Sequence, residues 1–191
     1  MTQEEKIAIA ETVRHRDRFG PVSQEELAAL SGKETELWIQ TKNGYCVHVF
    51  EERPEALPDR APILLNFHGG GFLKGRTDRE RRYCCAVMEA TNALVWDVDY
   101  SLAPEKPFPY AAEESYGIIQ YVFEHAEELC IDPEKIMLAG HSAGGNLVAS
   151  ALVKNAETKA FHPCCALMEY FPTDNTANPV ERLSEELKQD P

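Results

Sequence analysis

The sequence predicts an α/β protein with a mostly parallel sheet and helices on both faces of that sheet. Compact apolar segments of strand length, at 62–67, 93–100, 135–139 and 164–171, alternate with segments of helical periodicity. Such alternation is typical of parallel sheets, because each crossover helix covers one face. The 191 residues, 43% of them hydrophobic, suffice for one sizeable core, and no repeat or linker divides them.

The first 34 residues are expected to form a helical N-terminal arm, which precedes an α/β core at 35–191. Thr2 with Glu5, and Ser23 with Glu26, match the capping box that opens a helix. In this motif the hydroxyl and the carboxylate three residues later each accept a hydrogen bond from the other residue's backbone N–H. Two short helices are therefore expected in the arm.

The core is expected to begin with a β-hairpin and to continue with three helices. Alternating segments at 35–41 and 45–50 flank Asn43 and Gly44, a dipeptide typical of a two-residue hairpin turn. The helices are expected at 78–91, around 119–126 and at 142–155.

Acidic residues outnumber basic residues by 32 to 19, which gives a net charge of −13 and a pI near 4.9. Nucleic acids and anionic membranes attract proteins with a positive field, so neither is expected as a partner. The segment 1–11 is too acidic and polar for a signal peptide. No apolar run approaches the roughly 20 residues that cross a bilayer, so no membrane span is expected.

The cysteines predict reduced thiols, packed as small core residues in a cytoplasmic protein. The six are Cys46, Cys84, Cys85, Cys130, Cys164 and Cys165. Four of them form two adjacent pairs, and neighbours in sequence rarely cross-link to each other. No Cys/His spacing resembles a zinc site, so no metal is expected.

The segment from Gly140 to Gly144 places Ser142 in a G-x-S-x-G pattern between a buried strand and a helix. The two glycines lack side chains, so the backbone can turn sharply and expose the Ser142 hydroxyl at the carboxyl edge of the sheet. The amino end of the next helix favours negative charge at the same place. These features predict a nucleophile elbow.

A run of three glycines, from Gly69 to Gly71, follows His68 directly after a strand. Without side chains, successive N–H groups can converge on a bound oxygen, as they do in an oxyanion hole. A flexible turn is the alternative interpretation of this run.

A phosphate-binding loop is a further alternative, because residues 70–77 nearly match the P-loop pattern. However, Arg76 stands where the pattern has the lysine that reaches the terminal phosphates. Asp97 and Asp99 are the conceivable magnesium-binding acids. This alternative predicts a nucleotide-binding protein.

A third segment, Asp99-Tyr-Ser-Leu-Ala-Pro-Glu, completes a set of ordered motifs. Together with His68-Gly-Gly-Gly and Gly140-His-Ser-Ala-Gly-Gly-Asn, it resembles the hormone-sensitive-lipase-like family of α/β-hydrolases over roughly residues 60–175. The resemblance implies the α/β-hydrolase fold and a carboxylic ester hydrolase that acts on small-molecule esters. It implies no metal and no organic cofactor.

The resemblance also implies roles for individual residues. Ser142 matches the nucleophile that forms an acyl-enzyme, and the N–H groups of Gly70, Gly71 and Ala143 match the oxyanion hole. The residues that match structural support of the site are His68, Gly69, Asp99, Tyr100, Glu105, Gly140 and Gly144. His141 departs from the family, which usually has an acid there, and the sharp turn is expected to direct its side chain away from the nucleophile.

The sequence after Ser142 lacks a complete catalytic triad. In this fold an acid and then a histidine follow the serine, but the one later histidine, His162, precedes a strand and is expected at the opposite edge of the sheet. Asp174 has no histidine after it. We therefore expect a truncated chain, with its last strands beyond Pro191 and weak or no activity. The alternative is a pseudohydrolase that binds a small molecule.

Two further expectations concern an exposed edge strand and a cluster of basic residues. The strand Cys164–Phe171 is expected at an uncovered edge of the sheet, which invites self-association. A basic cluster after the glycines either steers acidic esters toward Ser142 or is a solvated turn of a helix. The cluster consists of Lys74, Arg76, Arg79, Arg81 and Arg82.

Overall fold

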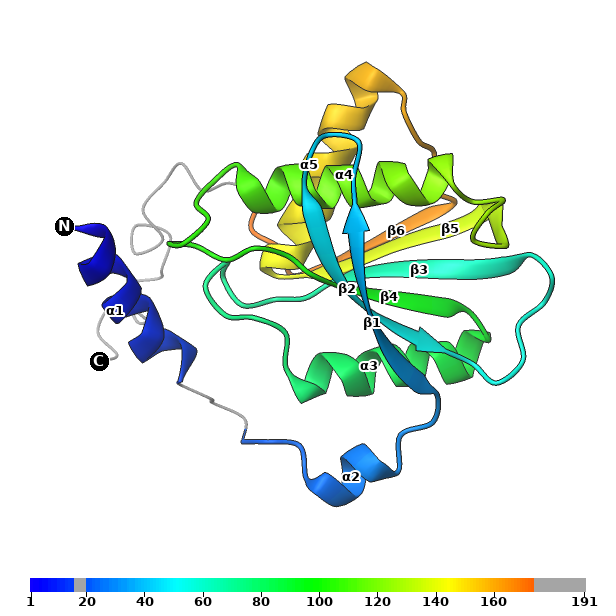
Figure 1. Cartoon of the computed structure of the whole chain (residues 1–191), viewed down its shortest axis with the longest axis horizontal. Coiled ribbons are helices and arrows are strands. Elements are labelled where there is room, and N and C mark those ends of the chain that lie inside the picture. The colour runs from blue at the N-terminus through cyan, green and yellow to red at the C-terminus, as the bar shows by residue number, and fades with distance from the viewer. Residues whose placement is uncertain (16–19, 174–191) are drawn as a thin grey trace, which may run out of the picture.

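One six-stranded sheet organises the chain, of which the computed structural model describes residues 1–15 and 20–173. Across the sheet the strands lie in the order β1-β2-β4-β3-β5-β6 (Figure 1). The elements in chain order are α1 (Gln3–Arg14), α2 (Gln24–Ala28), β1 (Lys33–Gln40), β2 (Cys46–Arg53), β3 (Ala61–Phe67), α3 (Asp78–Thr91), β4 (Leu94–Asp99), α4 (Tyr110–Glu124), β5 (Ile131–His141), α5 (Ala143–Thr158) and β6 (Cys165–Glu169).

The predicted mostly parallel sheet with helices on both faces is confirmed. Strands β4, β3, β5 and β6 are parallel, whereas β1 and β2 pair with antiparallel neighbours. Figure 1 shows α3 on one side of the sheet and α4 and α5 on the other. Successive side chains of a strand point to opposite faces, so Ile63 and Leu65 join the core under α4 and α5, and Leu64 joins the one under α3. Strand β3 is a continuous apolar run because both of its faces pack in a hydrophobic core.

The hairpin of β1 and β2 is present, but its predicted two-residue turn is wrong. Thr41 N donates to Tyr45 O at 2.8 Å, so three residues form the loop, and Gly44 takes the positive φ of 93° that such loops use. The Asn43 amide is engaged elsewhere, because its Nδ2 donates to Glu113 O of α4 at 2.9 Å. The longer turn thus brings the Asn43 side chain into contact with α4.

Both capping boxes of the N-terminal arm are formed. Thr2 with Glu5 opens α1, and Ser23 with Glu26 opens α2. Strand β1 begins at Lys33, close to the predicted division between the arm and the core. Within the described ranges, every helix falls short of the length and apolar character that a membrane span requires.

The prediction that the cysteines are core residues is wrong for four of the six. All six are free, but only Cys84 and Cys85 of α3 are buried. The exposed ones are Cys46, Cys130, Cys164 and Cys165. Their exposure follows from their positions, because they lie at strand starts or in the turns that connect elements.

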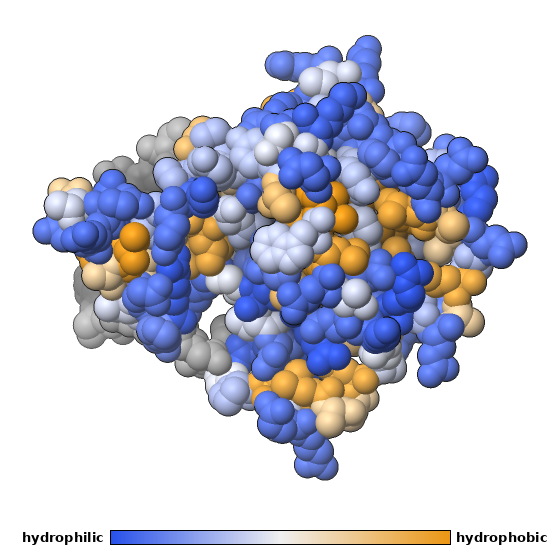
Figure 2. Space-filling view, in the orientation of Figure 1, coloured by the Kyte–Doolittle hydropathy of each residue, from blue (hydrophilic) through white to orange (hydrophobic). Residues whose placement is uncertain are grey.

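Strand β6 lies at the edge of the sheet, as predicted. It pairs with β5 on one side, and no other strand of the described residues pairs with it. Its Leu167 is 50% exposed, which is high for an apolar side chain in a strand. Elsewhere, Figure 2 shows a face covered mainly by hydrophilic residues, with hydrophobic residues in separate patches.

Candidate active site

Ser142 occupies a sharp turn between the end of β5 and the start of α5. Its backbone has φ 52° and ψ −118°, a combination that a residue with a side chain rarely adopts. Close packing holds it there: a Cβ on Gly140 would lie 2.5 Å from Gly144 C, and one on Gly144 would lie 1.8 Å from Phe67 O. Ser142 N also donates to Glu169 O of β6 at 2.9 Å. This geometry matches the strained strand-to-helix turn of a nucleophile elbow.

The glycine run forms a tight turn beside this elbow. Gly70 O accepts hydrogen bonds from Leu73 N at 3.1 Å and Lys74 N at 3.0 Å. Gly70 has φ 131° and Gly71 has φ 62°, and a Cβ on Gly70 would lie 2.4 Å from Lys74 O. Among the described residues, the N–H groups of Gly70, Gly71 and Ala143 donate to no acceptor. Ala143 is the first residue of α5, where a helix leaves its N–H groups unpaired.

His68 packs against the glycine run. Its ring is fully buried, stacks on Tyr100 at 4.3 Å between centroids, and places Nδ1 2.7 Å from Gly69 O. Tyr100 Oη donates to His68 O at 2.8 Å. The supporting contacts of His68, Gly69 and Tyr100 are therefore those of a scaffold under the loop.

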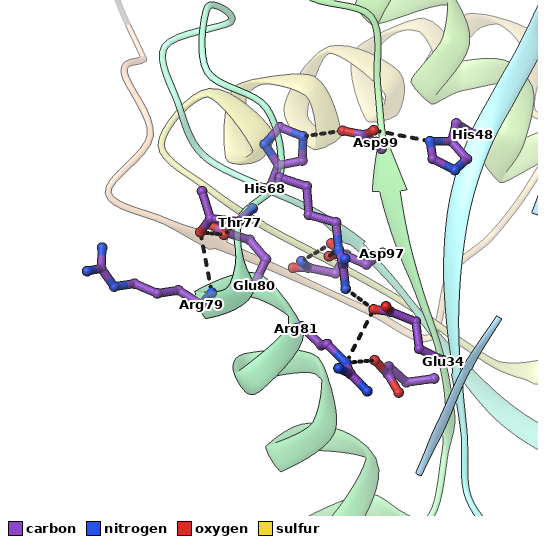
Figure 3. Close-up of polar contacts among 12 residues, drawn as sticks. Glu34, His48, His68, Thr77, Arg79, Glu80, Arg81, Asp97 and Asp99 are labelled. Atoms are coloured by element: carbon purple, nitrogen blue, oxygen red, sulfur yellow. Dashed lines mark hydrogen bonds and ion pairs between the residues drawn. The ribbon is translucent and has the colours of Figure 1, made fainter. Parts of the chain in front are cut away.

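Asp99 lies between two histidines. Figure 3 shows His68 on one side and His48 on the other, with ring nitrogens 3.5 and 3.1 Å from its carboxylate oxygens. Burial of His68 by itself would lower its pKa, but Asp99 and the Gly69 carbonyl raise the pKa above its usual value. Burial would likewise raise the pKa of Asp99, and the two histidines lower it. The interaction between His68 and Asp99 thus favours the charged forms of both groups.

Glu105 is joined to the N-terminal arm by Arg14, a residue that sequence reasoning missed. Arg14 of α1 reaches both Glu105 carboxylate oxygens, at 2.7 and 2.6 Å. It also donates to Leu73 O, two residues past the glycine run, at 2.7 Å and to Ala103 O at 3.0 Å. Glu105 is therefore linked to the segment after the glycine run through a partner far away in sequence, and no local pattern signals such a pair.

The contact made by the His141 side chain was also not predicted from the sequence. Its side chain leaves the elbow on the side of the glycine run, where Nε2 accepts a hydrogen bond from Gly69 N at 3.1 Å. The sequence showed that His141 stands where the family usually has an acid, but it did not show that the ring contacts Gly69.

The basic cluster divides into two groups. Arg76 lies 2.5 Å from Asp97 Oδ2 and 2.5 Å from Glu34 Oε2. Arg81 lies 3.1 Å from Glu52 Oε1, and Figure 3 shows it facing Glu34 as well. Asp97 and Glu52 are fully buried, so these two arginines offset part of the cost of burying acidic side chains within the fold. The other group, Lys74, Arg79 and Arg82, lines the cavity described below, which Arg76 also borders.

The arrangement of Arg76 speaks against the P-loop interpretation. The side chain that would have to reach a terminal phosphate is engaged by Asp97 and Glu34. Thr77 caps α3, where its hydroxyl accepts a hydrogen bond from Arg79 N at 3.3 Å. Asp97, a conceivable magnesium ligand, has no exposed surface.

An open cavity of about 930 Å³ lies in front of the elbow and the glycine run. Gly70, His141 and Ser142 form part of its wall. Its charged lining residues are Arg14, Lys74, Arg76, Arg79, Glu80, Arg82 and Glu169. The cavity has room for a small-molecule ester beside the Ser142 hydroxyl.

No histidine of residues 1–15 and 20–173 forms a hydrogen bond with the Ser142 hydroxyl. His162 is exposed and lies before β6, at the amino edge of the sheet, as predicted. The remaining histidines are at the surface or packed: His15 on the end of α1, His48 beside Asp99 and His125 at the end of α4. Asp174 lies outside the described residues.

A sequence model described as "alpha/beta hydrolase fold" matches residues 64–191. The chain is 34% identical over 169 residues to an AB hydrolase superfamily protein of Schizosaccharomyces pombe, covering 87% of this chain and 48% of that protein. It is 35% identical over 122 residues to Esterase LipI of Mycobacterium tuberculosis, covering 63% of this chain and 38% of the esterase.

Human hormone-sensitive lipase is 36% identical over 104 residues, which cover 54% of this chain and 10% of the lipase. Among solved structures, a bacterial heroin esterase has a TM-score of 0.73 at 29% identity, over 91% of this chain and 53% of that one. The chain thus spans about half the length, or less, of these curated relatives.

Proposed function

This chain belongs to the hormone-sensitive-lipase-like family of the alpha/beta hydrolase fold, and from that membership we propose that it is a carboxylic ester hydrolase with Ser142 as its nucleophile. The observation that carries the proposal is the elbow at Ser142, whose φ of 52° is held between glycines that admit no side chain. Strained backbone of this kind clusters at functional sites, and Ser142 lines the cavity in front of the elbow.

The proposed reaction proceeds through an acyl-enzyme. The Ser142 hydroxyl oxygen attacks the ester carbonyl carbon as its proton leaves to a base, and the carbonyl oxygen becomes an oxyanion. The N–H groups of Gly70, Gly71 and Ala143, which donate to no acceptor among the described residues, stabilise that oxyanion. The alcohol then departs, and water hydrolyses the acyl group from Ser142.

The base is the part of this machinery that the described residues do not supply. Removal of the base from a serine hydrolase lowers kcat by up to about 10⁶. We therefore propose that the 191-residue chain turns over esters slowly. The same observation favours a second candidate, a pseudohydrolase that binds a small molecule in the cavity without cleaving it.

Two measurements on the 191-residue chain test these proposals. Hydrolysis of p-nitrophenyl acetate is measured for the native chain, for Ser142→Ala and for Ser150→Ala, an exposed serine of α5 that serves as the matched control. Reaction with a fluorophosphonate, followed by peptide mass spectrometry, locates the reactive serine. We expect slow hydrolysis and labelling that both disappear only in Ser142→Ala.

Hydrolysis that persists unchanged in Ser142→Ala would remove Ser142 from the reaction. Absence of any label together with saturable binding of an ester analogue would instead favour the pseudohydrolase.

We also propose a cytoplasmic location, which agrees with six free cysteines. Fractionation of the source cells tests this, and recovery in a secreted fraction would contradict it.

A further inference from the structure

His141 joins the elbow to the glycine run directly. It is the last residue of β5 and immediately precedes Ser142. Its Nε2 accepts the Gly69 N–H at 3.1 Å, and a Cβ on Gly69 would lie 3.0 Å from its Cδ2. A ring nitrogen that accepts a hydrogen bond carries no proton, so this contact requires the neutral imidazole with its proton on Nδ1.

The same ring nitrogen faces a carboxylate. Glu80 Oε1 of α3 lies 3.6 Å from His141 Nε2. The capping box of α3 orients this carboxylate, because Glu80 Oε2 accepts hydrogen bonds from Thr77 N, at 3.0 Å, and from the Thr77 hydroxyl. Burial alone would raise the pKa of Glu80, but hydrogen bonds with His141 in its protonated form and with Thr77 lower it to about 2. A protonated His141 therefore faces an ionised Glu80.

The other titratable groups around His141 do not replace Glu80. Tyr83 of α3 and Tyr170, which follows β6, lie with ring centroids 6.3 and 6.0 Å from the imidazole. Burial raises the pKa of each of these tyrosines, so both are neutral. Glu169 of β6 pairs in register with His141, and His68 is engaged by Gly69 O through its Nδ1. Glu80 is the carboxylate that faces Nε2.

We propose that neutral His141 positions the oxyanion loop, which is the glycine run Gly69–Gly71, by accepting a hydrogen bond from the Gly69 N–H. When His141 is protonated, its ring donates to Glu80 instead and the loop is no longer fixed. A proton from solvent adds to Nε2, which then donates to Glu80 Oε1. The Gly69 N–H loses its acceptor, and the N–H groups of Gly70 and Gly71 lose their fixed direction. His141 is thus a positioning residue for the oxyanion hole, and the inference rests on the proposed function of Ser142.

The first test reads the contact without any activity. In the ¹⁵N-labelled 191-residue chain, long-range ¹H–¹⁵N spectra report which nitrogen of His141 carries the proton, and the Gly69 amide resonance is followed against pH. We expect the proton on Nδ1 at neutral pH and a Gly69 amide shift with the midpoint of His141. A proton on Nε2 at neutral pH, or a Gly69 amide that does not follow His141, overturns the proposal.

The second test compares two substitutions by their rates of fluorophosphonate labelling at Ser142 between pH 5 and 8. His141→Phe keeps a ring but removes the acceptor, and we expect roughly tenfold slower labelling at neutral pH. His141→Gln keeps an acceptor that does not titrate. It is expected to recover most of that loss and to lack the decline of the native chain at low pH.

Labelling of His141→Phe at the native rate, with the native pH profile, contradicts the positioning role. If no variant and not even the native chain is labelled, the proposed function of Ser142 fails. The Gly69 resonance still decides the role of His141 in that case, so the two failures are distinguishable.

Discussion

Arg14 in the N-terminal helix holds both carboxylate oxygens of Glu105, at 2.7 and 2.6 Å, across 91 residues of sequence. The same guanidinium donates to Leu73 O, just past the glycine run. These contacts lower the pKa of Glu105 and raise that of Arg14. The N-terminal arm is thereby anchored to two loops that border the proposed site.

Arg14→Ala should release α1 from these loops. Because the Glu105 carboxylate is well exposed, we expect a loss of at most about 1 kcal/mol in the free energy of unfolding. The larger effect should be faster amide hydrogen exchange in α1, measured by mass spectrometry. Lys6→Ala, an exposed residue of the same helix, is the control. Equal exchange in the two variants would show that Arg14 does not anchor the arm.

Gly144→Ala should be severely destabilising, because the new Cβ would lie 1.8 Å from Phe67 O and 2.6 Å from His68 O. Backbone atoms cannot yield as side chains do, so we expect a loss of about 3 kcal/mol or more, or no folded protein. Gly75→Ala is the control, since its nearest neighbour would lie 3.6 Å away. Thermal unfolding of the two variants compares them, and equal midpoints would contradict the close approach.

Arg76→Met should leave the buried Asp97 carboxylate without its cation. Loss of one member of a buried pair costs about 3–5 kcal/mol. The control is Arg82→Met, whose partner Glu26 lies 3.4 Å away with both side chains about half exposed, and which should change the stability far less. Urea unfolding measures both values. The double substitution of Arg76→Met with Asp97→Asn should recover part of the loss, whereas fully additive losses would refute the pairing.

Glu52→Gln should change how stability depends on pH. Burial raises the pKa of Glu52 from 4.5 to about 7, so the folded chain prefers the protonated carboxyl. The stability from this preference is fully present below pH 4.5 and is lost as the pH rises through about 7. Glutamine stays neutral, so the variant should lack this loss, on the order of 1–3 kcal/mol.

Urea unfolding of the native chain, Glu52→Gln and the exposed control Glu55→Gln at pH 5 and pH 8 measures the difference. The free energy of unfolding of Glu52→Gln, relative to that of the native chain, should be higher at pH 8 than at pH 5. Glu55→Gln should show no such difference. A native chain whose stability does not fall more than that of Glu52→Gln over this interval would contradict the raised pKa.

Leu167→Lys should reduce self-association if copies pair through β6. Leu167 is 50% exposed on the edge strand, and a lysine there opposes strand pairing. Sedimentation velocity over a range of concentrations compares the native chain with Leu167→Lys. Val153→Lys, at a 71% exposed position on α5, controls for the added charge. A native chain that is monomeric at every concentration, or oligomers that survive Leu167→Lys but not Val153→Lys, would reject pairing at this edge.

Much of the fold was predictable because its signals are local. The capping boxes at Thr2 and Ser23 formed, since each needs only residues three positions apart. The elbow at Ser142 was predictable for a similar reason, because its glycines and the flanking strand and helix are contiguous. The length of the hairpin turn was not, because Asn-Gly occurs in both two-residue and three-residue loops, and the contact of Asn43 with Glu113 exists only in the folded chain.

The sequence by itself determined the α/β class, the order of the elements and the placement of Ser142 and the glycine run at one edge of the sheet. Only the tertiary structure decided which charged and polar side chains pair: Arg14 with Glu105, Arg76 with Asp97, and His141 with Gly69. Periodicity and motifs depend on neighbours along the chain, so they can be read from sequence. The choice of partner depends on which segments packing brings within about 3 Å of each other, and that distance exists only in the folded chain.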